Sequence, residues 1–377
     1  MFNPVQLQML RLISEAGPLS RTELAGRTGM SKAAVSLLTR ELLDGGLLAE
    51  TETVRGTGRP SIRLGLLGSS AHFVGVSLVE APVVMVLTDL NGKLLGRHEI
   101  DWSNDASEVG RLIAAGLPAL TAGRANVAGV GVALSGYVDP SQTRCLKSTL
   151  LGWQDVPAAS LMEAEIGLPT AIENDAKAVA LGERLFGAIR DKGSFSLISV
   201  GDGIGCGHII NGRLYRGSHG GAGEIAHATI EPDGLPCRCG KRGCLDTVAS
   251  LMAIQSSART AGLPGDVKAL EQLASNGHGE AIAILHRAGA ALGLAIAQII
   301  QIIDPERIIV THRHGALDGL YGTVTRATIE ANVLPRIAGE IDIQFRHVSA
   351  DIWARGAASI AADKFLSNPV LHQKDVV

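Results

Sequence analysis

The sequence predicts an α/β protein in which a small helical module with a two-stranded wing precedes a two-lobed body. Short helical patterns separated by glycines fill the first part of the chain, and strand-like segments then alternate with helical ones. The alternation starts a second time at Phe195–Val200, as expected for two α/β lobes with a cleft between them. With 377 residues, 46% of them hydrophobic, the chain can bury several cores, which excludes a disordered protein.

Charge and hydropathy narrow the class of protein further. The formal net charge is −3, but residues 1–65 hold eight Lys/Arg and six Asp/Glu, a net +2, so the remainder carries −5. The chain begins without a basic segment ahead of an apolar one, and no uncharged apolar run is long enough to span a membrane. The longest such run, Ala288–Ile303, is expected to be a buried helix. We therefore expect a cytoplasmic protein without membrane contact.

The N-terminal module, residues 1–66, carries helix start and stop signals at short intervals. Apolar residues at helical spacing run from Val5 to Ala16, and a Gly-Pro pair follows. Ser20 and Glu23 form the sequence pattern of a capping box for a second helix that ends near Thr28. This short helix, a turn at Gly29 and the helix that follows have the spacing of a helix-turn-helix.

A third helix and a wing complete the predicted module. Gly29 supplies the turn, Ser31 caps a helix over Lys32–Asp44, and two strand-like segments follow around the basic, glycine-rich stretch 54–60. Such a helix enters the major groove of DNA, and a wing arginine suits a narrow minor groove. A small helical domain used for protein contacts is the alternative. The candidate DNA-binding residues are Arg21, Ser31, Lys32, Ala33, Ser36, Arg40, Arg55, Gly58 and Arg59.

Two motifs of the body suit recognition of hydroxyl and phosphate groups. Asn174-Asp175 follows a short strand, where Asn suits bidentate hydroxyl recognition and Asp suits acceptance of a hydroxyl proton. The same pair is also a good helix N-cap. The loop Gly201–Gly207 follows the strand Ser196–Val200 and has the glycines of a phosphate cradle, which a tight turn equally needs.

A cluster of sulfur and imidazole side chains predicts a metal site. One histidine and three closely spaced cysteines form a Cys₃His set, which is typical of a closed, tetrahedral, structural Zn²⁺ site. The predicted ligands are His227, Cys237, Cys239 and Cys244. Reduced, packed thiols are the alternative. Cys145 and Cys206 stand apart in the sequence and are expected to be buried apolar residues.

These motifs resemble those of the ROK family of repressors, open-reading-frame proteins and sugar kinases, over essentially the whole chain. The family signature is matched by Gly223-Glu-Ile-Ala-His227 and by Cys237-Arg-Cys-Gly-Lys-Arg-Gly-Cys-Leu-Asp246, and the repressor branch by the wing sequence Gly58-Arg59-Pro60. The resemblance implies a winged helix-turn-helix followed by a two-lobed fold of the actin-like, hexokinase-type ATPases. The implied domains are a DNA-binding domain at 1–66, a first lobe at 71–190 plus about 348–377, and a second lobe with the zinc site at 191–347.

The resemblance also implies a sugar pocket. Its lining residues would be Asn174, Asp175, Glu224, His227 and Asp246, with His227 bound to the zinc ion as well. Asp246 stands where the family has a glutamate that is one methylene longer, and Leu150 stands where an asparagine is common. We therefore expect altered or weaker binding of the sugar.

The kinase motifs for ATP are altered at three places. The first phosphate motif, Asp-x-Gly-x-Thr, corresponds to Ser77–Ala81, and the second, Gly-Thr-Gly, to Gly201-Asp202-Gly203. The Gly-Gly pair of the adenosine motif is replaced within Thr311-His312-Arg313. The first motif has lost its carboxylate, its glycine and its hydroxyl, the second has gained a carboxylate, and the third has gained bulk. All of these changes oppose nucleotide binding. No ATP cofactor, catalytic residue or kinase activity is expected.

The expected function is a sugar-responsive, DNA-binding transcriptional regulator, a repressor by the resemblance. Its partners would be operator DNA and a monosaccharide or sugar phosphate, with xylose, glucose and N-acetylglucosamine among the candidates. A homodimer is expected, with a tetramer as the alternative. Two other functions stay open: a repressor body controlled by a protein partner, and an active sugar kinase with an accessory DNA module, which the presence of Asp175 permits.

Overall fold

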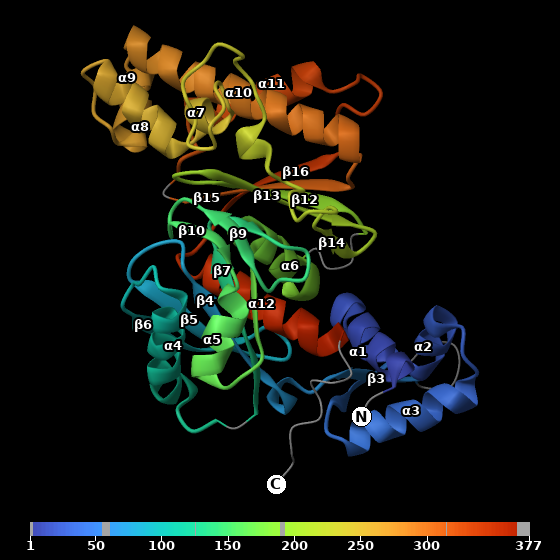
Figure 1. Ribbon diagram of the computed structural model, residues 1–377. Coiled ribbons are helices and arrows are strands. Elements are labelled where there is room, and N and C mark those ends of the chain that lie inside the picture. The colour runs from blue at the N-terminus through green and yellow to red at the C-terminus, as the bar shows by residue number, and fades with distance from the viewer. Residues whose placement is uncertain (1–2, 55–60, 125, 189–192, 314, 368–377) are drawn as a thin grey trace. The chain divides into compact units, whose positions relative to one another are not determined.

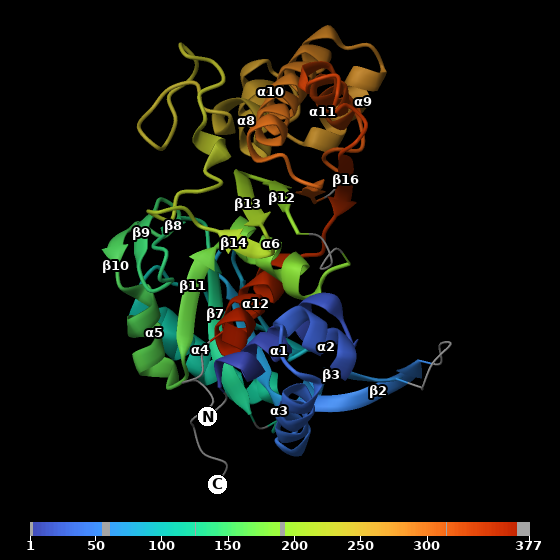
Figure 2. The same ribbon diagram turned by 90° about the vertical axis from the view of Figure 1, so that its right-hand side faces the viewer.

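The computed structural model describes residues 3–54, 61–124, 126–188, 193–313 and 315–367. The chain divides into two compact units, residues 1–191 together with 351–377, and residues 192–350. Figure 1 and Figure 2 show the elements of each unit, coloured along the chain.

The first unit begins with three helices and a small antiparallel sheet of order β1-β3-β2. These elements are α1 (Pro4–Ala16), β1 (Leu19–Ser20), α2 (Arg21–Thr28), α3 (Lys32–Asp44), β2 (Leu48–Val54) and β3 (Ser61–Leu66). The predicted capping box of α2 is confirmed, because Ser20 N donates to Glu23 Oε2 at 2.7 Å and Glu23 N donates to Ser20 Oγ at 3.2 Å. Gly29 ends α2 in the left-handed conformation at φ 72°, so the expected turn is present.

A five-stranded sheet of order β11-β7-β4-β5-β6 forms the body of the first unit. Its elements, with the short sheet β8–β10 and the covering helices, are η1 (Gly68–Ser70), β4 (His72–Ser77), β5 (Val83–Asp89), β6 (Leu94–Ile100), α4 (Ala106–Thr121), β7 (Val127–Leu134), β8 (Tyr137–Val138), β9 (Cys145–Ser148), β10 (Trp153–Val156), α5 (Ala158–Ile166), β11 (Thr170–Asn174), α6 (Asp175–Phe186) and α12 (Ile352–Ser367).

Alternate residues of the central strands serve two different cores. Phe73 of β4 packs in the core with α12, whereas Val74 packs in the core with α4 and α5. Helix α12 comes so close to the sheet that a Cβ at Gly75 or Gly131 would lie 1.9 Å from a carbonyl oxygen of that helix. The two glycines therefore set the depth at which α12 packs.

The winged helix and the body of the first unit share one hydrophobic core. Leu10 and Ile13 of α1 belong to the same cluster of buried residues as Ala358 and Phe365 of α12. Polar contacts add to it, since Arg11 lies 3.8 Å from Asp363 Oδ1 of α12. The winged helix is thus packed on the lobe that carries it.

The second unit has its own five-stranded sheet, of order β14-β13-β12-β15-β16, with helices of its own. Its elements are β12 (Phe195–Val200), β13 (Ile204–Ile210), β14 (Arg213–Tyr215), η2 (Ile225–His227), α7 (Asp246–Ala249), α8 (Leu251–Thr260), α9 (Val267–Ser275), α10 (Gly279–Ile303), β15 (Arg307–His312), α11 (Leu320–Asn332) and β16 (Asp342–His347).

Helix α10 is long and apolar enough to cross a membrane by length and composition alone. Twelve of its residues, from Ala281 to Ile300, are buried within the second unit, where Leu292 and Ile296 have no exposed surface. The helix is therefore a core element, as the small-residue run of the sequence predicted.

Candidate functional site

The candidate DNA-binding residues of α3 lie on one exposed face. They repeat at spacings of three and four residues, which share a side of a helix. The exposed members are Lys32, Ala33, Ser36 and Arg40. Ser31 caps the helix, because its Oγ accepts a hydrogen bond from Ala34 N at 3.2 Å.

The other DNA-binding candidates lie outside this helix. Arg21 opens α2 and lies 3.5 Å from Glu50 Oε1 of β2, so part of its charge is neutralised. The wing candidates Arg55, Gly58 and Arg59 lie outside the described residues.

Sequence reasoning missed Leu37, which is 59% exposed on the same face of α3. The signal was available in the helical spacing, because Leu37 stands four residues after Ala33 and three before Arg40. An apolar side chain on a helix that enters the major groove suits the methyl group of thymine.

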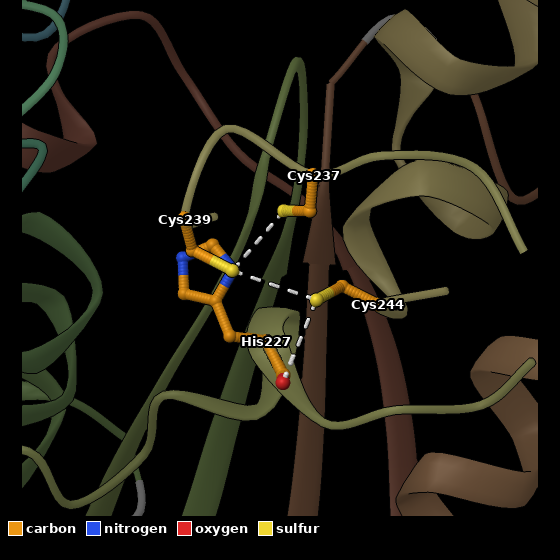
Figure 3. Close-up of side chains that lie close together, drawn as sticks. All are labelled: His227, Cys237, Cys239 and Cys244. Atoms are coloured by element: carbon orange, nitrogen blue, oxygen red, sulfur yellow. Dashed lines mark hydrogen bonds between the residues drawn. The ribbon is translucent and has the colours of Figure 1, made fainter. Parts of the chain in front are cut away.

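The four predicted metal ligands of the second unit converge on one point, as Figure 3 shows. Their ligand atoms, one from each of His227, Cys237, Cys239 and Cys244, all lie within 4.8 Å of one another. His227 Nδ1 is 3.6 Å from Cys237 Sγ, and the sulfurs of Cys239 and Cys244 are 3.6 Å apart. The chain therefore gathers three thiols and one imidazole in a set that can hold a metal ion.

The local backbone explains how residues so far apart in sequence meet. Gly243 has φ +66° and passes so close to the backbone of Glu231 that a Cβ would overlap its carbonyl oxygen. Lys241 Nζ donates to the His227 carbonyl oxygen at 2.6 Å and ties the cysteine loop to η2. The glycine and the lysine together close the loop around the cluster.

The thiols of the cluster differ in acidity. Burial and the neighbouring thiols raise the pKa of Cys244 to about 12. At Cys239 burial acts in the same direction but is outweighed by hydrogen bonds from the Lys241 backbone and the neighbouring thiols, so its pKa is lowered. A bound cation would displace the remaining thiol protons, because thiolates are the ligands.

Two residues predicted for the sugar pocket, Asn174 and Asp175, lie at the junction of β11 and α6 in the first unit. Asn174 Oδ1 accepts from Lys177 N at 3.2 Å, and its Nδ2 donates to the Gly136 carbonyl oxygen at 3.2 Å. Asp175 Oδ1 accepts from Ala176 N at 2.8 Å. Asn174 is thus the N-cap of α6, the alternative role that the sequence allowed. These hydrogen bonds fix both side chains at the end of β11.

Buried charges adjoin this pair and were missed by sequence reasoning. Glu173 and Lys177 are each only 1% exposed. Charged side chains are buried to this degree when they are paired. Glu173 points inward because side chains alternate along β11, and Lys177 points inward because of the helical period of α6. From the sequence alone, neither residue could be distinguished from a charged surface residue.

Three further sugar-pocket candidates, Glu224, His227 and Asp246, belong to the second unit. Glu224 precedes η2, which ends at His227. Asp246 is 8% exposed, and its two carboxylate oxygens already have partners, Ile204 N at 3.2 Å and Arg238 Nη2 at 3.1 Å. Asp246 therefore holds the turn between β12 and β13 through its hydrogen bond from Ile204 N.

The three altered nucleotide motifs fall at strand ends. Ser77 ends β4 and is followed by Leu78, which is fully buried. Gly201-Asp202-Gly203 forms the tight turn between the antiparallel strands β12 and β13. His312 ends β15 and is 2% exposed. By the resemblance, Ser77 stands where the kinase motif has an aspartate, Asp202 where it has a threonine, and His312 within the place of the Gly-Gly pair.

A winged helix joined to a two-sheet α/β body with this histidine–cysteine cluster defines a class of proteins that combines a DNA-binding module with a sugar-kinase-type fold. The chain belongs to the ROK family, whose model matches residues 74–364, and the model of the MarR family matches residues 2–59. The predicted family and fold class are confirmed.

Two known regulators are similar to the chain along nearly its whole length, and a kinase is similar to most of it. The xylose repressor of Bacillus spizizenii is 26% identical over 367 residues, which cover 96% of this chain and 95% of that repressor. A solved ROK-family transcriptional regulator, a homologue of the E. coli Mlc protein, has a TM-score of 0.79 and 28% identity over 96% of this chain and 98% of its own. A glucokinase from Streptomyces griseus, solved with glucose and AMPPNP, has a TM-score of 0.66 and 26% identity over 78% of this chain and 100% of its own.

Proposed function

We propose that the protein is a sugar-responsive transcriptional regulator, a repressor, that binds operator DNA through α3 and the wing. One observation carries the proposal. The winged helix shares a hydrophobic core with the lobe that presents Asn174 and Asp175, so a change at the sugar site has a packed route to the DNA-binding module. The similarity to a xylose repressor and to a ROK-family transcriptional regulator supports the same function.

Helix α6 is the proposed element of communication. It begins at Asp175, and Arg184 in its last turn lies 2.9 Å from Glu15 of α1. The nine residue steps from Asp175 to Arg184 span about 14 Å along a helix axis, at 1.5 Å per residue. We propose that the first unit has two conformations, which differ in the position of α6 and of α1 packed against it. A sugar that binds these two conformations with different affinity shifts the equilibrium between them. Two winged helices in a homodimer would then change their spacing on a pseudo-palindromic operator.

We propose Zn²⁺ as the ion of the cysteine cluster. A closed Cys₃His set leaves no position for a substrate, so the ion would hold the cysteine loop and the imidazole of His227 in place. Glu224 directly precedes η2, the 3-10 turn at the cluster, and His227 is its last residue. Loss of the ion would therefore disorder η2 and the side chains of Glu224 and His227, both of which are candidates for sugar binding.

The proposed sensor does not transfer phosphate. Asp175 would accept a hydrogen bond from the sugar, while the positions of Ser77, Asp202 and His312 oppose nucleotide binding. Calorimetry with ATP and Mg²⁺ tests this directly. The expected result is no heat of binding. In a separate assay, ADP release that depends on sugar would establish the alternative, an active kinase.

The regulator is tested by operator binding. Purified full-length protein is titrated onto DNA from upstream of its own coding region at moderate salt, with and without each sugar of a panel. We expect binding that one sugar or sugar phosphate changes. A response to no sugar, despite specific DNA binding, would favour control of the body by a protein partner.

A further inference from the structure

A second group of metal-ligand side chains, distinct from the cysteine cluster, lies at one end of the β15–β16 pair. His312 and His347 are the last residues of these parallel strands and are direct cross-strand partners. Asp318 belongs to the loop that leads from β15 to α11. One ligand atom from each of the three residues lies within 4.8 Å of the other two. Register and loop therefore bring two imidazoles and a carboxylate together.

The spacing of the ligand atoms fits a single ion. His347 Nε2 is 3.0 Å from Asp318 Oδ1, His312 Nε2 is 3.8 Å from the same oxygen, and the ring centroids of the two histidines are 4.4 Å apart. Ligands held at about 2.0–2.2 Å from one ion lie roughly 3–3.5 Å from each other. Binding would thus need shifts of only a few tenths of an ångström at the two nitrogen–oxygen distances.

His312 is the member that a surface ion pair does not explain. It is 2% exposed, and its Nε2 lies 3.8 Å from Asp318 Oδ1, beyond hydrogen-bond distance.

The loop is built to present the carboxylate. Gly315 has φ +70°, and a Cβ there would lie 2.8 Å from Asp318 Oδ2. Asp318 N donates to the Gly315 carbonyl oxygen at 3.0 Å, which closes the turn. Val348 N donates to the His312 carbonyl oxygen at 3.1 Å and fixes the strand ends. The loop turn and the two strand ends that carry the three side chains are therefore fixed by backbone hydrogen bonds.

We propose that His312, Asp318 and His347 form a second metal site, which takes a divalent transition ion of the Zn²⁺ class with water in the open positions. Two imidazoles and one carboxylate suit such an ion and leave coordination sites free, unlike the cysteine cluster. The ion would join the ends of both strands to the loop before α11. This proposal does not depend on the protein being a regulator of transcription.

Zinc stoichiometry tests the site. Full-length protein without an affinity tag is dialysed against buffered, low-micromolar free zinc, and bound zinc is measured by atomic emission. The variants are His347→Ala and Asp318→Asn, whose side chains are 60% and 57% exposed and so are not part of the core. His286→Ala is the matched control, because His286 is an exposed histidine on α10 of the same unit.

Wild-type protein and His286→Ala are expected to bind the same number of zinc ions. His347→Ala and Asp318→Asn are expected to bind one ion fewer, with unchanged circular dichroism. Equal zinc content in wild type and His347→Ala would overturn the site. A loss in His286→Ala as large as in His347→Ala would also overturn it, since the binding would then be unspecific to this cluster.

Discussion

The guanidinium of Arg184 lies 2.9 Å from the carboxylate of Glu15, and this ion pair joins the last turn of α6 to the last turn of α1. Both side chains are largely buried, at 8% and 17% exposure. Glu15 also accepts from Arg11 Nε at 2.9 Å, and Arg11 in turn lies 3.8 Å from Asp363 of α12. Three helices of the first unit therefore meet around one carboxylate, at the join between the winged helix and the lobe.

Glu15→Gln is expected to lower the free energy of unfolding by about 1–3 kcal/mol, because a largely buried guanidinium loses a charged partner. Operator affinity without sugar should stay within a few-fold of wild type, whereas the change in affinity caused by sugar should shrink. Urea unfolding and operator titration measure the two effects. The matched control is Glu99→Gln, whose pair with Arg97 is more than 40% exposed on both sides and should matter little. A full sugar response in Glu15→Gln would argue against α6 as the link.

Substitutions on α3 should separate phosphate contact from base contact. Arg40→Ala is expected to weaken binding to all DNA sequences alike and to reduce the slope of log affinity against log salt by about 1. Leu37→Ala is expected to leave that slope unchanged and to relax the preference at one A·T position. Fluorescence anisotropy over a salt series measures both. Arg336→Ala, an exposed arginine of the second unit, should change neither quantity.

Removal of the cysteine-cluster metal should abolish the sugar response and leave the winged helix folded. Cys239→Ser loses one of four ligands, so we expect loss of one zinc ion and of sugar-dependent change in operator affinity. Cys145→Ser is the control, a buried cysteine outside the cluster. Zinc analysis and operator titration give the readout. Full zinc content together with a full response in Cys239→Ser would refute the role of the cluster.

The capping box of α2 predicts a pH dependence. Hydrogen bonds from the backbone N–H and the hydroxyl of Ser20 lower the pKa of Glu23 below its ordinary value. A carboxylate with a depressed pKa in the folded state stabilises the protein above its unfolded pKa of about 4.3, and this contribution is lost as the pH falls through the folded value.

Glu23→Gln keeps the acceptor oxygen but removes the charge. The variant should therefore be less stable than wild type near neutral pH, and the difference should vanish in acid. Urea unfolding at several pH values tests the sign. The exposed Glu330→Gln on α11 should show no such convergence. A difference that grows on acidification would contradict the assignment.

The sequence predicted the local features of the molecule well, because local chemistry sets them. The limits of α3, Lys32–Asp44, and the cap of α2 follow from Ser, Glu and Gly at fixed offsets. The cysteine cluster was also predictable, since three of its four ligands lie close together in sequence.

Long-range contacts were beyond the sequence patterns. No local sequence pattern predicts that α12, a helix more than 200 residues further along the chain, packs against Gly75 and Gly131. The pairing of His312 with His347 depends on the register of two parallel strands separated by a helix. The join of α1 with α6 and α12 likewise needed the packed structure, because the apolar face of α1 is equally consistent with a self-contained winged helix.

We propose that one chain couples sugar binding to operator binding without phosphoryl transfer. The most direct test is an operator titration with full-length, zinc-loaded protein against xylose, glucose, N-acetylglucosamine and their phosphates, each with and without ATP and Mg²⁺. We expect one sugar to change operator affinity by about five- to 150-fold, the usual range of allosteric coupling, and ATP to change nothing. Unaltered affinity with every sugar, or a response that requires ATP, would contradict it.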